Sequence, residues 1–261
     1  MKIFKWIKNL FKKRFRMGTG LTPQKTDNRD KKYRTIGKTK NNTNIATKTG
    51  TVRNQGRSNA CTAFAVCEMM DYFLEHKKNI SWKGFKSSPL YLWYFCRLKE
   101  GNNRKNYGAV LRNVFKTIKN YGFVLEKQHP FSNNWYKRPE PKIVQAGYFF
   151  KLYLKQLPKY YSIRTRNRYF SKHVSNCLTN EHPIVFGFPI YDELAFAKST
   201  SYKINTSTGK YRGYHAMLIV GENKNYYIIK NSWGTRWGRK GYCWIKKDLI
   251  QKQGIDFWTL K

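Results

Sequence analysis

Helix-type and strand-type sequence patterns occupy different parts of this 261-residue chain. Apolar residues recur at helical spacing in three early segments, 60–76, 89–100 and 110–122. The segments after about residue 140 are short, aromatic and β-branched, with Gly and Asn between them, which is typical of strands: 160–170, 183–191, 215–222, 226–233 and 242–247. Helices that precede strands predict an α+β fold with two subdomains.

The start of the chain has its own pattern. Residues 1–17 place apolar side chains on one helical face and lysines mostly on the other. This helix either binds a membrane surface or a polyanion, or it docks on its own domain. No apolar run in it is long enough for a signal peptide or a membrane span. Residues 18–53 predict an extended, loop-rich lead-in.

We expect three parts along the chain. They are a basic amphipathic extension over 1–24, a helical subdomain over 25–135 that carries the nucleophile, and a β-rich subdomain over 136–261 that carries its histidine and asparagine partners. The chain is long enough to bury a sizeable core, and aromatic residues at 17% of the sequence supply large side chains to fill it.

The net charge is strongly positive, with 52 Lys and Arg against 14 Asp and Glu and a formal charge of +38. A field of this sign attracts polyanions such as nucleic acid or anionic lipid, and the Lys- and Arg-rich N-terminus is the expected contact. A coding sequence rich in A and T would raise Lys without depleting Glu, so the shortage of acids points to selection. Solubility in a composition-biased genome is the other interpretation.

Five cysteines occur at irregular spacings: Cys61, Cys67, Cys96, Cys177 and Cys243. An odd count in a chain of this length fits a reducing compartment better than a disulfide framework. That compartment would be the cytoplasm or, for a viral protein, the virion. No CxxC pair occurs, so we expect no structural metal. We also expect no cofactor and a monomer.

Cys61 follows a polar loop and opens the first predicted helix. A helix N-terminus carries a partial positive charge and free N–H groups, which stabilise a thiolate. Cys67 is rotated from Cys61 by about 240° at 3.6 residues per turn, so it should pack in the core. On cysteine usage alone, either residue is more often a buried apolar residue than a nucleophile.

His215 differs from the other histidines because it begins an apolar strand. Asn231 closes the next hydrophobic strand, 16 residues later. Its amide oxygen can accept a hydrogen bond from the Nδ1–H group of His215, which would leave Nε2 for a thiol. Trp233 can cover that bond from water. Each residue alone has a structural interpretation, but the three together favour catalysis.

Two stretches, NQGRSNACTAFA (54–65) and GYHAMLIVGENKNYYIIKNSWGTRWGRKGYCWI (213–245), resemble the two most characteristic regions of papain-like cysteine peptidases. Weaker similarities lie at 27–30, 121–131 and 183–191, and the resemblance covers about residues 25–255. It implies a papain-like two-subdomain fold, in which an N-terminal helical subdomain packs against a C-terminal antiparallel β-barrel-like subdomain.

The resemblance also implies roles for individual residues. Cys61 would be the nucleophile, His215 its base and acid, Asn231 the residue that orients His215, and Gln55 the side-chain donor to the oxyanion. The reaction would be peptide hydrolysis through a thioester. Gly108 and Trp233 would contact the peptide or protein substrate, Trp233 also shielding the histidine–asparagine bond.

The sequence departs from the family pattern at several positions. Ser58 stands where the family usually has a disulfide-bonded cysteine, Asn59 replaces a glycine beside the oxyanion loop, and Thr62 replaces a tryptophan. The separation of Cys61 from His215 is 154 residues, slightly beyond the family's roughly 130–150. Only 54 residues precede Gln55, so a long inhibitory prosegment would not fit and control must come from elsewhere or be absent.

Two alternatives to an active peptidase remain at this point. One is a catalytically weak or inactive papain-like relative that acts as a basic, nucleic-acid- or membrane-associated binding or structural protein. The other is an acyl-transferring Cys–His enzyme of the transglutaminase type, which normally orients its histidine with Asp, so Asn231 argues against it. Substrate specificity and the choice between endopeptidase and exopeptidase action stay open.

Overall fold

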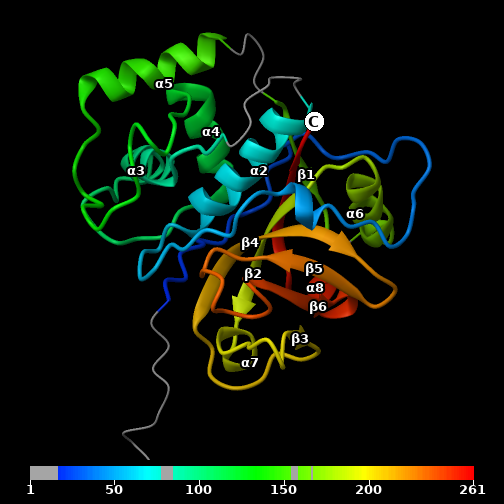
Figure 1. Ribbon diagram of the computed structural model, residues 1–261. Coiled ribbons are helices and arrows are strands. Elements are labelled where there is room, and N and C mark those ends of the chain that lie inside the picture. Colours follow the sequence, from blue (N-terminus) through cyan, green and yellow to red (C-terminus); the bar gives the residue numbers. More distant parts are fainter. Residues whose placement is uncertain (1–16, 78–84, 154–157, 166) are drawn as a thin grey trace, which may run out of the picture.

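The computed structural model describes residues 17–77, 85–153, 158–165 and 167–261. Helices gather on one side of the molecule and a β-sheet on the other, as Figure 1 shows. The helical side contains α2 (Cys61–Lys77), α3 (Pro89–Lys99), α4 (Leu111–Tyr121) and α5 (Pro141–Tyr153). The predicted α+β class, with helices first and an antiparallel sheet later, is confirmed.

The three predicted helices form where local signals start and stop them. The hydroxyl of Ser88 accepts a hydrogen bond from the N–H of Tyr91 at 3.2 Å, and Pro89 occupies the first turn of α3. Gly122 ends α4 with a φ of 69°, an angle that glycine adopts without strain. These helices therefore follow from their sequence signals.

Helix α5 was not predicted, because its aromatic and β-branched residues resemble a strand pattern. Close packing against α4 supports it: a Cβ on Gly147 would lie 2.1 Å from the Tyr91 hydroxyl and 2.6 Å from the carbonyl oxygen of Tyr121. The tertiary contact overrides local propensity here.

The sheet has seven strands in the order β1-β7-β2-β4-β5-β6-β3. Neighbours are antiparallel except β3 and β6. The strands are β1 (Tyr160–Ile163), β2 (Ile184–Ile190), β3 (Lys203–Ile204), β4 (Gly213–Glu222), β5 (Tyr226–Lys230), β6 (Tyr242–Lys246) and β7 (Ile255–Leu260).

The second half of the chain contains helices that the sequence did not predict. The expected strand 160–170 is wrong beyond Ile163, because helix α6 (Phe170–Thr179) begins at Phe170. Phe170, Val174, Cys177 and Leu178 of α6 are buried at helical spacing, but basic and polar residues between them hide the pattern. Strands β3 and β7 and two short helices of this half, α7 (Asp192–Ala195) and α8 (Lys247–Gln253), were also missed, as was η1 (Ala46–Lys48) in the lead-in.

Strand β4 belongs to both hydrophobic cores. Ala216 and Leu218 face the core built around α2, and Met217 and Ile219 face the core between the sheet and α6. This alternation is the period of two expected for a strand buried on both faces. Because β4 packs on α2, the start of the helix lies against the start of the strand.

The lead-in 18–53 is mostly extended, as predicted, and it crosses between the two layers. It makes isolated bridges at Leu21 with Ala109 and at Lys32 with Ser162. The proposed amphipathic helix 1–17 lies, apart from Met17, outside the described residues. The domain boundaries at 24 and 135 stay predictions. Within the described part of the chain, every helix is too short or too polar to cross a membrane.

Candidate active site

Cys61 is the first residue of α2, and its side chain is completely buried between the helix and the sheet. Its Sγ atom accepts hydrogen bonds from two backbone N–H groups, Ala216 at 3.4 Å and Gly20 at 3.2 Å. Burial raises the pKa of the Cys61 thiol to about 11, and these hydrogen bonds act in the opposite direction. Burial therefore favours the neutral thiol over the thiolate. Cys67 is buried further along α2, as predicted.

His215 and Asn231 meet in the buried interior of the sheet. The ring nitrogen Nε2 of His215 lies 2.8 Å from Oδ1 of Asn231. Because Oδ1 also accepts the N–H of Ser232 at 2.7 Å, it is an acceptor, and Nε2 must carry the proton. The expected tautomer, with Nδ1 bound to asparagine, is thus wrong.

The second ring nitrogen of His215, Nδ1, is not bound by Asn231. The N–H of Ala216, the next residue after His215, reaches the sulfur, so the sulfur lies near the backbone of this strand. Nδ1 is the ring nitrogen closer to the backbone, and it is buried without a hydrogen-bond partner among the described residues. Burial lowers the pKa of His215 to about 4, and the hydrogen bond that Nε2 donates to Asn231 acts in the opposite direction.

Trp233 packs on the histidine ring, as the sequence suggested. The two ring centroids are 4.4 Å apart at an interplanar angle of 33°, and Trp233 is only 3% exposed. The ring therefore covers the bond between His215 and Asn231, and exclusion of water strengthens such a bond.

Gln55 is buried beside these residues, and both ends of its amide are engaged. Its Nε2 donates to the carbonyl oxygens of Ser58 at 2.7 Å and Gly18 at 3.2 Å. Its Oε1 accepts the hydroxyl of Ser232 at 2.6 Å. Ser232 was not singled out from the sequence, where it was noted only as part of the Asn-Ser-Trp-Gly block. Its contact with Gln55 spans 177 residues.

Gly108 packs closely against the backbone of Gly20. A Cβ added to it would lie 2.2 Å from the carbonyl oxygen of Gly20. The next residue, Ala109, forms the hydrogen bonds: its N–H donates to Gly20 at 2.8 Å and its carbonyl accepts from Thr22 at 3.1 Å. Ala109 is therefore the backbone contact that the sequence did not locate.

Residues 18–22 fill the space between α2 and β4, and we call them the strap. They lie across the residues just described, at the dark blue start of the described chain in Figure 1. The strap contacts Gln55 and Trp233 through the carbonyl of Gly18, and it contacts Cys61 through the N–H of Gly20. The sequence analysis predicted an extended lead-in here but not its position against Cys61.

The departures from the family pattern have simple local consequences. The hydroxyl of Ser58 donates to the carbonyl of Gln55 at 2.8 Å, so it closes the turn before the helix. The amide of Asn59 donates to the carbonyl of Asn106 at 2.7 Å, which directs it to the neighbouring loop. All five cysteines are free. No cluster of His, Cys, Asp and Glu suited to a metal ion occurs among the residues that the structure describes.

Comparison with known proteins identifies a protein family over most of the chain. Residues 23–257 match the papain family of cysteine proteases. An uncharacterized peptidase C1-like protein of Acanthamoeba polyphaga mimivirus is 28% identical over 220 residues, which are 79% of this chain and 68% of that protein. A cathepsin L-like proteinase of Fasciola hepatica is 26% identical over 210 residues, 78% of this chain and 59% of that protein.

The architecture resembles that of xylellain, a cysteine protease from Xylella fastidiosa. The TM-score is 0.81 at 24% sequence identity, and the match covers 96% of this chain and 98% of that one. The likeness confirms the papain-like fold, with its helical part and its antiparallel sheet. Together with the match over residues 23–257, it shows that the chain belongs to the papain family of cysteine proteases, which are hydrolases.

Proposed function

We propose that the chain hydrolyses peptide bonds with Cys61 as nucleophile and His215 as its base. The observation that carries this proposal is the line of contacts from Asn231 to His215 Nε2, together with the Ala216 N–H bond to the sulfur. Nδ1, the ring nitrogen that Asn231 does not bind, has no hydrogen-bond partner among the described residues and is available to accept the proton of the thiol. A nucleophile, a base and an orienting group in this order are the requirements for acyl transfer by a cysteine.

One proton passes between Cys61 and His215 in each half of the proposed reaction. The thiol of Cys61 gives its proton to Nδ1 of His215, and the thiolate attacks the substrate carbonyl carbon. The carbon–nitrogen bond breaks as the imidazolium protonates the leaving amine, which leaves a thioester on Cys61. Water then attacks the thioester, its proton passes to His215 and on to the sulfur, and the carboxylic acid product leaves.

Gln55 supports the negative charge on the substrate oxygen. Its Nε2 donates to a carbonyl oxygen in the structure, that of Gly18, so it can donate in the same way to an oxyanion. The backbone N–H of Cys61, at the first position of α2, is the second donor. The hydroxyl of Ser232 holds the other end of the Gln55 amide, so we propose it as a positioning residue.

Thiol reactivity and peptide cleavage, measured together, test the proposal. We expect an alkylating reagent such as iodoacetamide to label Cys61 faster than Cys67 at neutral pH, and His215→Ala to slow that labelling. A peptide-library digest should show cleavage that Cys61→Ser abolishes. Because the strap covers the sulfur, both assays also use the variant Gly20→Val. A Cβ at position 20 would lie 1.8 Å from the carbonyl oxygen of Asn59, so the strap cannot keep its position in this variant.

The alternative, a basic binding protein that retains the residues without turnover, makes the opposite prediction. In that case Cys61 of Gly20→Val would react no faster than a free cysteine peptide, and no peptide in the library would be cut. That result would exclude the peptidase.

A further inference from the structure

A pocket of about 580 Å³ opens between the helical side of the molecule and the edge of the sheet. Helices α2, α4 and α5 border it, and strands β1 and β7 come up beside α2 in the same region (Figure 1). Cys61, His215 and Asn231 are not among the described residues that line it. Small-molecule sites usually measure about 300–1,000 Å³. The pocket is therefore large enough for a ligand, and the proposed peptidase does not account for it.

The floor of the pocket is apolar and is built from both layers of the fold. Phe115 and Ile118 are one turn apart on α4, and Met70 of α2 joins them in the lining; all three are buried. Tyr160 of β1 and Leu260 of β7 are register partners, so their side chains share one face of the sheet. The rings of Phe115 and Tyr160 stack across the layers, with centroids 5.0 Å apart at an interplanar angle of 14°. A ligand that reaches this floor therefore meets aliphatic and aromatic surface.

The mouth of the pocket leaves further apolar surface in contact with water. Leu152, in the last turn of α5, is 73% exposed, more than any other large apolar residue that the structure describes. Pro158, ahead of β1, is half-buried in the lining. Contact between water and apolar surface is unfavourable, so a ligand with an apolar part gains free energy by covering Leu152 and the floor.

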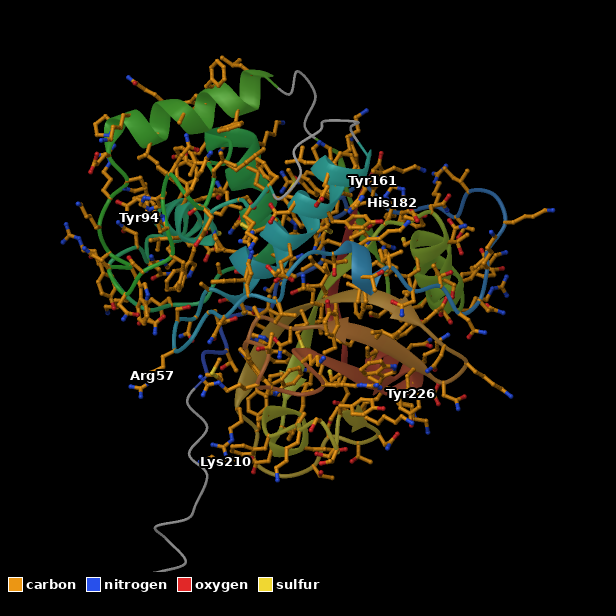
Figure 2. The ribbon with its side chains drawn as sticks, viewed as in Figure 1. Arg57, Tyr94, Tyr161, His182, Lys210 and Tyr226 are labelled. Carbon is orange, nitrogen blue, oxygen red and sulfur yellow. The ribbon has the colours of Figure 1, made fainter. Side chains whose placement is uncertain are left out.

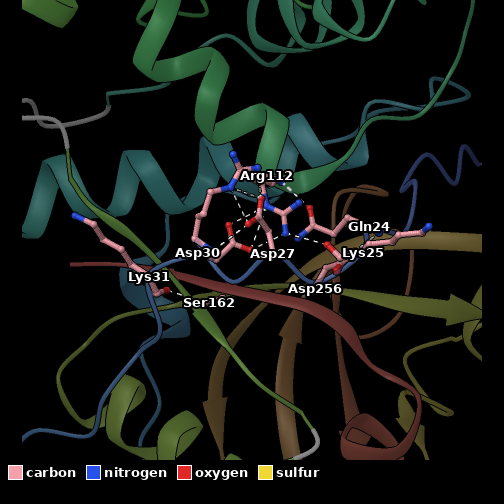
Figure 3. A network of polar contacts seen from close by, with 9 residues as sticks. Gln24, Lys25, Asp27, Asp30, Lys31, Arg112, Ser162 and Asp256 are labelled. Atoms are coloured by element: carbon pink, nitrogen blue, oxygen red, sulfur yellow. Dashed lines mark hydrogen bonds and ion pairs between the residues drawn. The ribbon is translucent and has the colours of Figure 1, made fainter.

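The charged groups of the lining are almost all cations. Its described residues include one acid, Asp30, and five basic residues: Arg29, Lys31, Lys119, Lys151 and Lys159. Asp30 is already paired with Arg112 at 2.6 Å, and Arg29 with Asp27 at 2.8 Å. Figure 3 shows Lys31 turned away from the network that holds Asp30. Within the described parts of the chain, the four lysines of the lining have no carboxylate partner.

The lysines stand at the mouth, directly next to residues of the floor. Lys119 follows Ile118 on α4, Lys159 precedes Tyr160 at the start of β1, and both lysines are exposed. A lysine packs its hydrocarbon stem on apolar surface and keeps its ammonium group in water. Positive charge thus surrounds the entrance to an apolar interior. This arrangement matches a molecule with an anionic head, which the lysines pair, and a hydrocarbon tail, which the floor buries.

We propose that this pocket binds the monomeric form of a long-chain carboxylate, with the tail on Phe115 and Ile118 and the head at the lysines of the mouth. A small anion without a tail would leave the apolar floor in water, and an uncharged hydrocarbon would leave the lysines without a partner. The inference goes beyond the proposed peptidase and does not depend on it, because binding is measured without turnover.

Titration calorimetry of the full chain with sodium dodecanoate, kept below its critical micelle concentration, tests the inference. We expect one molecule to bind per chain. The affinity should rise about fourfold for each CH₂ group added from octanoate to dodecanoate, which is the effect of burying one such group. Butanoate, which lacks the tail, and dodecyltrimethylammonium, whose head is positive, should bind at least about tenfold more weakly. An affinity that does not depend on tail length would overturn the inference.

A triple variant tests the part played by the head. Lys31→Gln, Lys119→Gln and Lys159→Gln together remove three exposed charges from the mouth and leave the floor as it is. Dodecanoate should bind to this variant about tenfold more weakly than to the wild type, because a partly exposed ion pair contributes modestly and three are lost. Thermal unfolding shows that the variant is folded.

The matched control removes the same net charge from exposed positions outside the pocket, with Lys210→Gln, Lys224→Gln and Lys246→Gln. It should bind dodecanoate as the wild type does. An equal loss of affinity in the two triple variants would mean that dodecanoate responds to the overall positive charge, and this result would refute the pocket as its site.

Discussion

His215 is kept neutral by its surroundings, and this gives it a signature in the pH dependence of stability. Its folded pKa of about 4 lies below the ordinary value of 6.5. The neutral ring therefore contributes stability that is present above pH 6.5 and is lost as the pH falls through 4. The change is on the order of 3 kcal/mol, since each pKa unit is about 1.4 kcal/mol.

We expect His215→Gln to lose less stability than the wild type between pH 6.5 and 4, as measured by urea unfolding. Asp71 and Asp256, whose pKa values burial raises to about 6, act in the opposite sense. They are common to both proteins and cancel in the comparison. An unchanged slope in His215→Gln would contradict a buried neutral ring.

The amide of Gln55 gives a second prediction at this scale. In the Gly20→Val background, Gln55→Ala should lower kcat/KM by about 10²–10³, the usual effect of removing one oxyanion donor. Ser232→Ala should have a smaller effect, because it removes only the hydroxyl that holds Oε1. Steady-state kinetics on one cleaved peptide checks both. Equal activity of Gln55→Ala and its parent would exclude Gln55 from the oxyanion site.

At the level of elements, Asn176 of α6 joins the lead-in to the sheet layer. The fully buried amide accepts the Tyr33 hydroxyl at 2.8 Å and the N–H of Ile36 at 3.1 Å, and it donates to the carbonyl of Ile36 at 3.0 Å. Asn176→Ala should lower the free energy of unfolding by about 2–3 kcal/mol, because buried partners are left unsatisfied.

Urea unfolding measures this loss, with Asn225→Ala as the control. Asn225 lies in the exposed turn between β4 and β5, so its removal should cost less than about 0.5 kcal/mol. A loss for Asn176→Ala as small as that of the control would mean that water replaces these bonds.

Elements with strong local signals could be predicted, and those that depend on partners could not. Helix α3 has Ser88 and Pro89 at its start, and β4 has an uninterrupted apolar run. Helix α5, by contrast, depends on the contact of Gly147 with α3 and α4, which no local pattern records. The same holds for the site. Cys61, His215 and Asn231 stand in recognisable sequence contexts. Two other features depend on tertiary packing: which ring nitrogen of His215 binds Asn231, and where the strap lies.

At the scale of the whole molecule, the positive charge is spread over the surface rather than confined to one element. Figure 2 shows Arg57 and Lys210 pointing outwards from different loops, and both are exposed. Residues 1–57 alone carry 17 Lys and Arg against 2 Asp. We propose that this charge, with residues 1–17 as its centre, binds nucleic acid or anionic vesicles.

The affinity for a DNA duplex, measured by fluorescence anisotropy, should fall steeply between about 50 and 200 mM salt, because binding releases counterions. A chain that lacks residues 1–17 should bind more weakly and with a smaller salt slope. If its affinity matches that of the full chain at both salt concentrations, residues 1–17 are not the contact.

The bond from the Ala216 N–H to the Cys61 sulfur has a mechanical consequence. The bond attaches the sulfur of the nucleophile to the peptide group that follows the base, His215. It therefore restrains the distance between nucleophile and base directly.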